Sequence, residues 1–128
     1  MKSLNGDLIK LAKNGMFDVI VHGCNCFNNM GAGIARDIKT HYKDAWKIDQ
    51  LTIYGSTNKL GTITYTEPIN GVIVVNAYIQ YRFGYGGPHC DYNAIRECMK
   101  VIKKTIQWKE NWYSFDWLWS CWWRLEHG

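Results

Sequence analysis

The stretch from Val19 to Ile38 constrains the fold of this chain more than any other stretch. It begins with Val-Ile-Val, an apolar run that is typical of a strand buried on both faces of a parallel sheet. A polar segment follows, and then Met-Gly-Ala-Gly-Ile-Ala, in which Gly31 and Gly33 allow the backbone to approach a ligand closely. Ile34 begins a helical apolar stripe. The pattern predicts a strand, a glycine loop and a helix whose first N–H groups suit a phosphate.

The glycine loop by itself leaves two interpretations open. It lacks the Lys-Ser/Thr ending of a P-loop and the third glycine of a dinucleotide fingerprint, so it could be a tight turn that holds no ligand. Its neighbourhood favours a ligand, because four polar residues stand at the carboxyl end of the strand, where open α/β sheets bind ligands. These residues are His22, Asn25, Asn28 and Asn29.

Hydrophobic periodicity predicts the remaining elements. Residues 1–10 are predicted to form a short strand, and a turn at Asn14-Gly15 precedes the strand 17–24. Helices are predicted from Gly33 to about Tyr42, around residues 45–51, and from residue 92 to 106 behind an Asp91 N-cap. Strands 60–66 and 72–79 are predicted to form a hairpin. This order of elements indicates an α/β fold.

Composition narrows the function classes. The chain has 128 residues, of which 47% are hydrophobic and 20% charged, which indicates one globular domain. The net charge of +4 suits a small anion, whereas the scattered Lys and Arg residues do not favour nucleic acid. We expect no membrane partner, because there is no apolar run of about 18 residues. Five cysteines and an N-terminus unlike a signal peptide favour free thiols in the cytoplasm. We expect an intact fold of this kind to be a monomer.

Zinc binding is another chemistry that the first buried strand could support. His22, Cys24 and Cys26 alternate and would share one face of a strand. Three ligands at a spacing of two are not a zinc pattern, and only His89 and Cys90 could complete the set. We expect no metal and no cofactor.

Three motifs together resemble the macrodomain family: Asn5-Gly6-Asp7-Leu8, His22-Gly23-Cys24-Asn25-Cys26 and Met30-Gly31-Ala32-Gly33-Ile34-Ala35. The resemblance covers about residues 1–107 and points to the small branch that processes ADP-ribose 1″-phosphate and ADP-ribosyl groups. It implies a three-layer α/β/α domain with a mixed sheet and a site for ADP-ribose or ADP-ribose 1″-phosphate. A compact stand-alone macrodomain would suit a phage or a microbe.

The resemblance also implies roles for individual residues. Asp7 would hold the adenine amino group and the Leu8 N–H the adenine ring, although Asp7 could instead be a turn carboxylate. Asn25 would bind the distal ribose. The N–H groups of Gly31, Ala32 and Gly33 would bind phosphate oxygens, Ile34 would line the ligand, and Gln80 and Tyr81 would line the ribose end.

Catalysis would depend on His22, which matches a histidine of the phosphatase-like branch that attacks, or moves a proton to, the terminal phosphate. Asp91 could orient that histidine or a water molecule. The alternatives are a buried His22 hydrogen-bonded to backbone and an Asp91 that only caps a helix. Dephosphorylation or hydrolysis of ADP-ribosyl groups therefore competes with a non-catalytic ADP-ribose reader.

The segment from Gln80 to Cys90 is rich in glycine and aromatic residues, including Tyr81, Phe83 and Tyr85. Because it follows a buried strand, it belongs on the same sheet edge as the Gly31 loop. Its aromatic rings could stack on adenine or cover a ribose, or the segment could be a surface loop without a ligand.

Residues 108–128 do not fit the family pattern, because they contain six of the seven tryptophans and show no helical or strand period. Tryptophan has the single codon TGG, and its GG read one nucleotide later begins a glycine codon. With permitted codons, residues 108–127 can be reread as Gly-Lys-Arg-Ile-Gly-Ile-Pro-Leu-Ile-Gly-Cys-Gly-Leu-Ala-Gly-Gly-Asp-Trp-Ser-Met, an apolar strand followed by a second phosphate loop.

We therefore predict a frameshift near Gln107, with a macrodomain over residues 1–107 and a tail over 108–128. The domain would lack its last strand, its second phosphate loop and its last helix, and the exposed sheet edge would leave it marginally stable. The alternative is a genuine aromatic tail that binds a partner or mediates oligomerisation.

Overall fold

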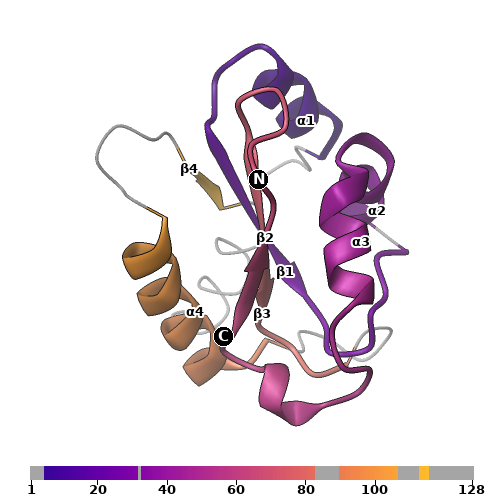
Figure 1. Cartoon of the computed structure of the whole chain (residues 1–128), viewed down its shortest axis with the longest axis vertical. Helices are drawn as coiled ribbons and strands as arrows, with labels where there is room; N and C mark the ends of the chain where they lie inside the picture. Colours follow the sequence, from indigo (N-terminus) through magenta and orange to yellow (C-terminus); the bar gives the residue numbers. More distant parts are fainter. Residues whose placement is uncertain (1–4, 32, 83–89, 107–112, 116–128) are drawn as a thin grey trace, which may run out of the picture.

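The sheet lies between two layers of helices (Figure 1). The computed structural model describes residues 5–31, 33–82, 90–106 and 113–115, with the backbone alone for 5–7 and 113–115. The elements are α1 (Asn5–Lys13), β1 (Val19–Cys24), α2 (Gly33–His41), α3 (Lys43–Gln50), the 3₁₀ turn η1 (Thr57–Lys59), β2 (Ile63–Tyr65), β3 (Ile73–Tyr78), α4 (Tyr92–Thr105) and β4 (Tyr113–Phe115). α1, α2 and α3 cover one face of the sheet and α4 covers the other, so the predicted three-layer α/β/α architecture is confirmed.

The sheet is mixed and has the strand order β2-β3-β1-β4. β1 runs parallel to both β3 and β4, whereas β2 runs antiparallel to β3 in the predicted hairpin. The hairpin turn is bridged between Ile69 and Val72, and its central residues have positive φ, 50° at Asn70 and 84° at Gly71. Two successive positive φ angles are the requirement of a type I′ turn, which Asn-Gly meets best.

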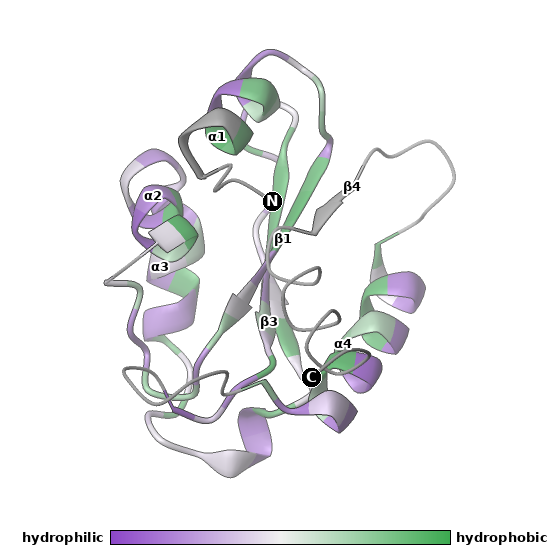
Figure 2. Cartoon of the chain, turned by 180° about the vertical axis from the view of Figure 1, so that it is seen from behind, coloured by the Kyte–Doolittle hydropathy of each residue, from purple (hydrophilic) through white to green (hydrophobic). Residues whose placement is uncertain are grey.

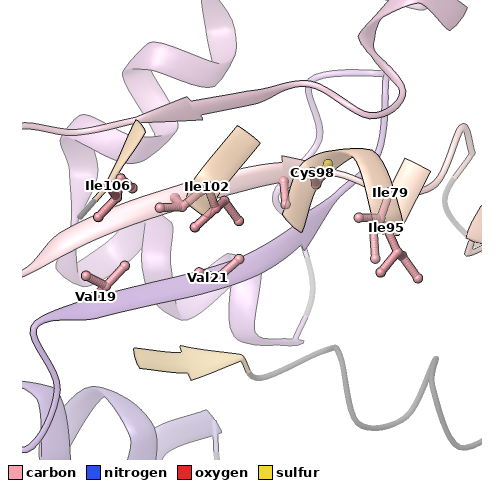
Figure 3. Close-up of a cluster of buried hydrophobic side chains, with 9 residues drawn as sticks. Val19, Val21, Ile79, Ile95, Cys98, Ile102 and Ile106 are labelled. Carbon is pink, nitrogen blue, oxygen red and sulfur yellow. The ribbon is translucent and has the colours of Figure 1, made fainter. Parts of the chain in front are cut away.

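β1 is the centre of the core because both of its faces are buried. Val19 and Val21 face α4 and pack with Ile95 and Ile102, as Figure 3 shows. Ile20 points to the opposite face and packs among residues of α1, α2 and α3. The apolar run at the start of β1 is therefore explained by burial on two sides, as the sequence predicted.

The helices are amphipathic, and Figure 2 shows hydrophobic and hydrophilic residues alternating along α4. α4 buries Ala94, Ile95, Cys98 and Ile102 and leaves Lys103 and Lys104 exposed. The predicted helices over α2, α3 and α4 are confirmed. Within the described residues, no helix combines the length and apolar character needed to cross a bilayer.

The prediction of a strand over residues 1–10 is wrong for the part that the structure describes, because Asn5–Lys13 form α1. Leu8, Ile9 and Ala12 are all buried in the core cluster that includes Ile20. Their spacings of one, three and four residues put them on one helical face, which a strand could not do.

The domain is predicted to lack its last core strand, and the described residues beyond 107 contain a strand of three residues. Tyr113–Phe115 form β4, which pairs in parallel with Val19–Val21 of β1. The edge of β1 is therefore covered over three residues, and the unpaired edge predicted there is shorter than expected.

Candidate functional site

The loop between β1 and α2 lies at the carboxyl edge of the sheet, where the site was predicted. β1 and β3 run in parallel with Cys24 opposite Tyr78, so both strands end at this edge. Beyond their ends, the amide of Cys26 donates to the carbonyl of Tyr81 at 3.1 Å. The loop after β1 and the segment after β3 are therefore held side by side, at the edge where open α/β sheets bind ligands.

Asn25 shapes the loop from within. Its side chain is 7% exposed, its Oδ1 accepts from the Phe27 amide at 2.8 Å, and its Nδ2 donates to the Asn29 carbonyl at 3.0 Å. Both ends of the carboxamide are thus used inside the loop. The contact of Asn25 with a distal ribose stays a prediction, while the observed bonds make Asn25 a structural brace.

Asn28 is the second brace of the loop, and sequence reasoning missed its partners. Asn28 has a φ of 52°, and its Nδ2 donates to the Thr52 carbonyl at 3.0 Å. Its Oδ1 accepts from Lys59 Nζ at 2.6 Å, and its carbonyl accepts from Gln50 Nε2 at 2.9 Å. No local pattern signals these bonds, because the partners lie 22 to 31 residues away.

Gly31 is exposed, and its amide points to a surface acceptor. The Gly31 N–H donates to Asn29 Oδ1 at 3.0 Å, and the Asn29 side chain is itself exposed. A Cβ on Gly31 would stand 3.2 Å from that oxygen, so the glycine leaves room for the close approach of an acceptor. The preceding Met30 is 3% exposed and packs with Cys24 and Tyr78, which anchors the loop to the core.

The first turn of α2 supplies further amides at the same edge. Gly33 opens α2 with a φ of 58°, and Ile34, half-buried, follows it. N–H groups in the first turn of a helix have no acceptor within that helix and carry the positive end of its dipole. Ala32, the third residue of the predicted phosphate loop, lies outside the described residues.

The predicted adenine contacts belong to α1. Asp7 lies in the first turn of α1, and its side chain is outside the described part of the structure. Leu8 is 4% exposed and packs in the core together with Ile9. The contacts of Asp7 and of the Leu8 N–H with an adenine ring stay predictions.

Gln80 and Tyr81 lie beside the loop, as expected from their place after β3. Tyr81 donates its hydroxyl to the Gly55 carbonyl at 2.9 Å, and its ring centroid is 4.9 Å from that of Phe27. Gln80 forms an isolated bridge with Cys90, and its Nε2 donates to the Arg82 carbonyl at 2.9 Å. Phe83 and Tyr85, the other aromatic candidates of this segment, lie outside the described residues.

His22 does not lie at the open edge. Its side chain has 0% exposure and its Nε2 is 2.6 Å from Asn76 Oδ1 on the neighbouring strand. Burial lowers the pKa of His22 from 6.5 to about 4, although the bond to Asn76 opposes that shift. His22 is therefore neutral near pH 7 and shielded from solvent. This placement matches the alternative in which His22 is a buried, hydrogen-bonded residue of the core. Its partner is the Asn76 side chain and not the backbone that was predicted.

Asp91 lies just before α4 and acts as its N-cap. Its Oδ1 accepts from the Ala94 amide at 2.9 Å, which satisfies one of the donors at the start of the helix. Asp91 has no hydrogen bond to His22 among the bonds of the described residues. The predicted role of Asp91 in orienting His22 therefore has no geometric support.

A cavity of about 360 Å³ lies elsewhere, between α1 and α2. Lys10 and Lys13 stand in the last turn of α1, and His41 ends α2. The lysines offset the negative end of the α1 dipole, and Lys13 Nζ donates to His41 Nδ1 at 2.9 Å, which explains the basic lining without a ligand. The cavity is lined by Ile9, Lys10, Lys13, Asn14, Asp37 and His41.

Within the described part of the chain, no group of three His, Cys, Asp or Glu side chains could hold a metal ion. Cys24, Cys26 and Cys98 are buried free thiols, whereas Cys90 is disulfide-bonded. Burial raises the pKa of the Cys24 thiol well above its ordinary value, so Cys24 is not activated as a nucleophile.

Comparison with known proteins identified a sequence relative in a phage. The chain is 32% identical over 119 residues to an uncharacterized 17.5 kDa protein from the tk-vs intergenic region of Enterobacteria phage T4. The match covers 83% of this chain and 74% of the phage protein. No family model matches the chain.

Solved structures resemble the fold. A Bacteroides thetaiotaomicron protein superimposes with a TM-score of 0.54 and 25% identity over 76% of this chain and 65% of its own. The macrodomain of Thermus aquaticus DarG gives a TM-score of 0.55 and 16% identity over 71% of this chain and 60% of its own. The chain therefore spans less than two thirds of the length of these structures, and its fold is macrodomain-like.

Proposed function

The chain belongs to the family of the uncharacterized 17.5 kDa phage T4 protein and has a macrodomain-like fold, and we propose that it binds ADP-ribose at the loop between β1 and α2. The diphosphate would lie against the amides of Gly31 and of the first turn of α2. The adenosine half would extend toward α1 and the distal ribose toward Gln80 and Tyr81.

The observation that carries this proposal is the bond between the Gly31 amide and Asn29 Oδ1. The amide already donates to an oxygen at the surface, and that oxygen belongs to an exposed side chain that can rotate away. A phosphate oxygen is a stronger acceptor than a carboxamide oxygen, because a charged acceptor roughly doubles the strength of the bond. Exchange of Asn29 for a diphosphate would therefore be favourable.

Processing of the ligand is the second candidate, either dephosphorylation of ADP-ribose 1″-phosphate or hydrolysis of an ADP-ribosyl group. The sequence resemblance to the phosphatase-like branch supports it. His22 could not supply the chemistry from its observed position, because it has 0% exposure. The geometry favours binding without catalysis by His22, which is the reader alternative.

Calorimetric titration with ADP-ribose tests the proposal. We expect saturable binding with a Kd at or below about 1 mM, equivalent to at least about 4 kcal/mol of binding free energy. Gly33→Val should abolish the heat, because a β-branched side chain is strained at a φ of 58° and would crowd the amides.

Gly15→Val is the matched control for this titration. Gly15 also has a positive φ, 83°, but lies in the turn before β1, where a Cβ would have no neighbour within 4 Å. Its variant carries a comparable backbone strain away from the loop and should retain the affinity of the wild type. Equal binding by the wild type and Gly33→Val, or no binding by the wild type, would contradict the proposal.

A further inference from the structure

Lys59 is a buried cation directly beneath the candidate loop. It ends η1, and its side chain is 7% exposed, an unusual state for a lysine. Its Nζ donates to Asn28 Oδ1 at 2.6 Å and to the Cys26 carbonyl at 3.2 Å. Both acceptors belong to the loop, so one ammonium group joins η1 to two residues of the segment that leads to Gly31.

The charge of Lys59 is supported from the side of the sheet. Nζ lies 4.9 Å from the centre of the Tyr78 ring, in the geometry of a cation–π contact. Tyr78 donates its hydroxyl to Asp49 Oδ1 at 2.7 Å, and Asp49 is 1% exposed. Burial lowers the pKa of Lys59, and the negative charge of Asp49 opposes that shift. Tyr78 therefore contacts both Lys59 and Asp49 and connects the core to the loop.

We propose that Lys59 is a positioning residue for the ligand loop: through Asn28 and the Cys26 carbonyl it sets the place of the Gly31 and Gly33 amides that receive the diphosphate. This inference deepens the proposed function and rests on it for the ligand. The reason for a lysine is that the three donors of an ammonium group can bond several loop acceptors at once.

Several hydrogen bonds hold the loop backbone at Asn28. Asn28 has a left-handed φ of 52°, a conformation that asparagine adopts more often than most other residues with a side chain. Thr52 and Gln50 hold the Nδ2 and carbonyl of Asn28, while Lys59 provides the short bond to its Oδ1. Without that bond, Asn28 Oδ1 would accept only from Thr52 Oγ1, at 3.3 Å, among the hydrogen bonds of the described residues. The loop would then be less tightly held and could shift.

The test measures loop position first and affinity second. In two-dimensional amide NMR spectra of the ligand-free full chain, Lys59→Met should move the Gly31 and Gly33 signals, and Lys59→Arg should keep them near wild type. ADP-ribose affinity should fall at least tenfold in Lys59→Met and stay within threefold of wild type in Lys59→Arg. Lys100→Met, which changes a lysine on α4 whose side chain is 64% exposed, is the matched control and should change neither readout.

A folded Lys59→Met variant with wild-type Gly31 and Gly33 signals would overturn the inference. A Lys59→Arg variant with shifted Gly31 and Gly33 signals and weakened ADP-ribose binding would also overturn it. If Lys59→Met does not fold, Asn28→Gly replaces it, since glycine tolerates the positive φ and removes the Oδ1 acceptor of Lys59 together with the Nδ2 bond to Thr52. Unchanged Gly31 and Gly33 signals in Asn28→Gly would then overturn it. Shifted signals in a chain that fails to bind ADP-ribose would contradict the proposed ligand and leave the positioning role intact.

Discussion

His22 makes the stability of the chain depend on pH. Its pKa is about 4 in the folded state, against an ordinary value of 6.5, because burial disfavours the imidazolium. As the pH falls from about 6.5 toward 4, the unfolded chain binds a proton that the folded chain does not bind. The free energy of unfolding should therefore fall by about 3 kcal/mol over this window, and urea denaturation at several pH values would measure it.

The control for this prediction is His22→Gln, whose amide nitrogen can still donate to Asn76 Oδ1. The variant should lose most of the pH dependence between about 6.5 and 4. We also expect the variant to bind ADP-ribose with wild-type affinity. Any release of phosphate from ADP-ribose 1″-phosphate should proceed at the same rate in the variant and in the wild type. Phosphate release by the wild type that disappears in this variant would restore a catalytic His22.

The partner of His22 could not have been predicted from the sequence. His22 and Asn76 are opposite each other in the parallel register of β1 and β3, although 54 residues separate them. The sequence predicts both strands, but it does not say which residues of two parallel strands face each other. The same limit hid Lys59, whose bond to Asn28 spans 31 residues.

At the scale of an element, Asp91 is expected to contribute to α4 alone. Asp91→Ala should lower the free energy of unfolding by about 1 kcal/mol, because the Ala94 amide loses its acceptor. Asp91→Asn keeps an N-cap oxygen and should lose much less. Chemical denaturation measures both changes, and calorimetry should give wild-type ADP-ribose affinity for each. Weaker ADP-ribose binding by Asp91→Asn would instead place Asp91 in the ligand site.

The elements that the sequence predicted well are those with a single dominant period. β1, α2 and α4 have buried residues at spacings that fit one type of structure, and the Asn-Gly turn determines the β2–β3 hairpin. α1 was mistaken for a strand because residues 8–12 are nearly all apolar, so that both periods could be fitted. The burial of Leu8, Ile9 and Ala12 against the sheet decides for a helix.

At the scale of the whole molecule, we propose that the codons after about residue 107 are read in a shifted frame. With permitted codons, the shifted frame can encode Ile-Pro-Leu at the three positions of β4, and two apolar residues would suit a strand beside β1. Proline is acceptable there only if β4 stays an edge strand. The coding DNA decides this proposal. Because TGG forces the six glycines, the codons between them are the test, and in the shifted frame they should spell an apolar strand followed by a loop. An early stop codon in that frame would reject it.

The amides of Gly31 and Gly33 are the proposed binding groups for the diphosphate of ADP-ribose. The most direct measurement is an amide NMR titration of the chain with ADP-ribose, carried to a ligand concentration of several mM so that a Kd of about 1 mM is exceeded. We predict that the Gly31 and Gly33 signals shift progressively and saturate, with little change in the signal of Gly15 at the far end of β1. Signals of Gly31 and Gly33 that stay in place while ADP-ribose is added would contradict the account.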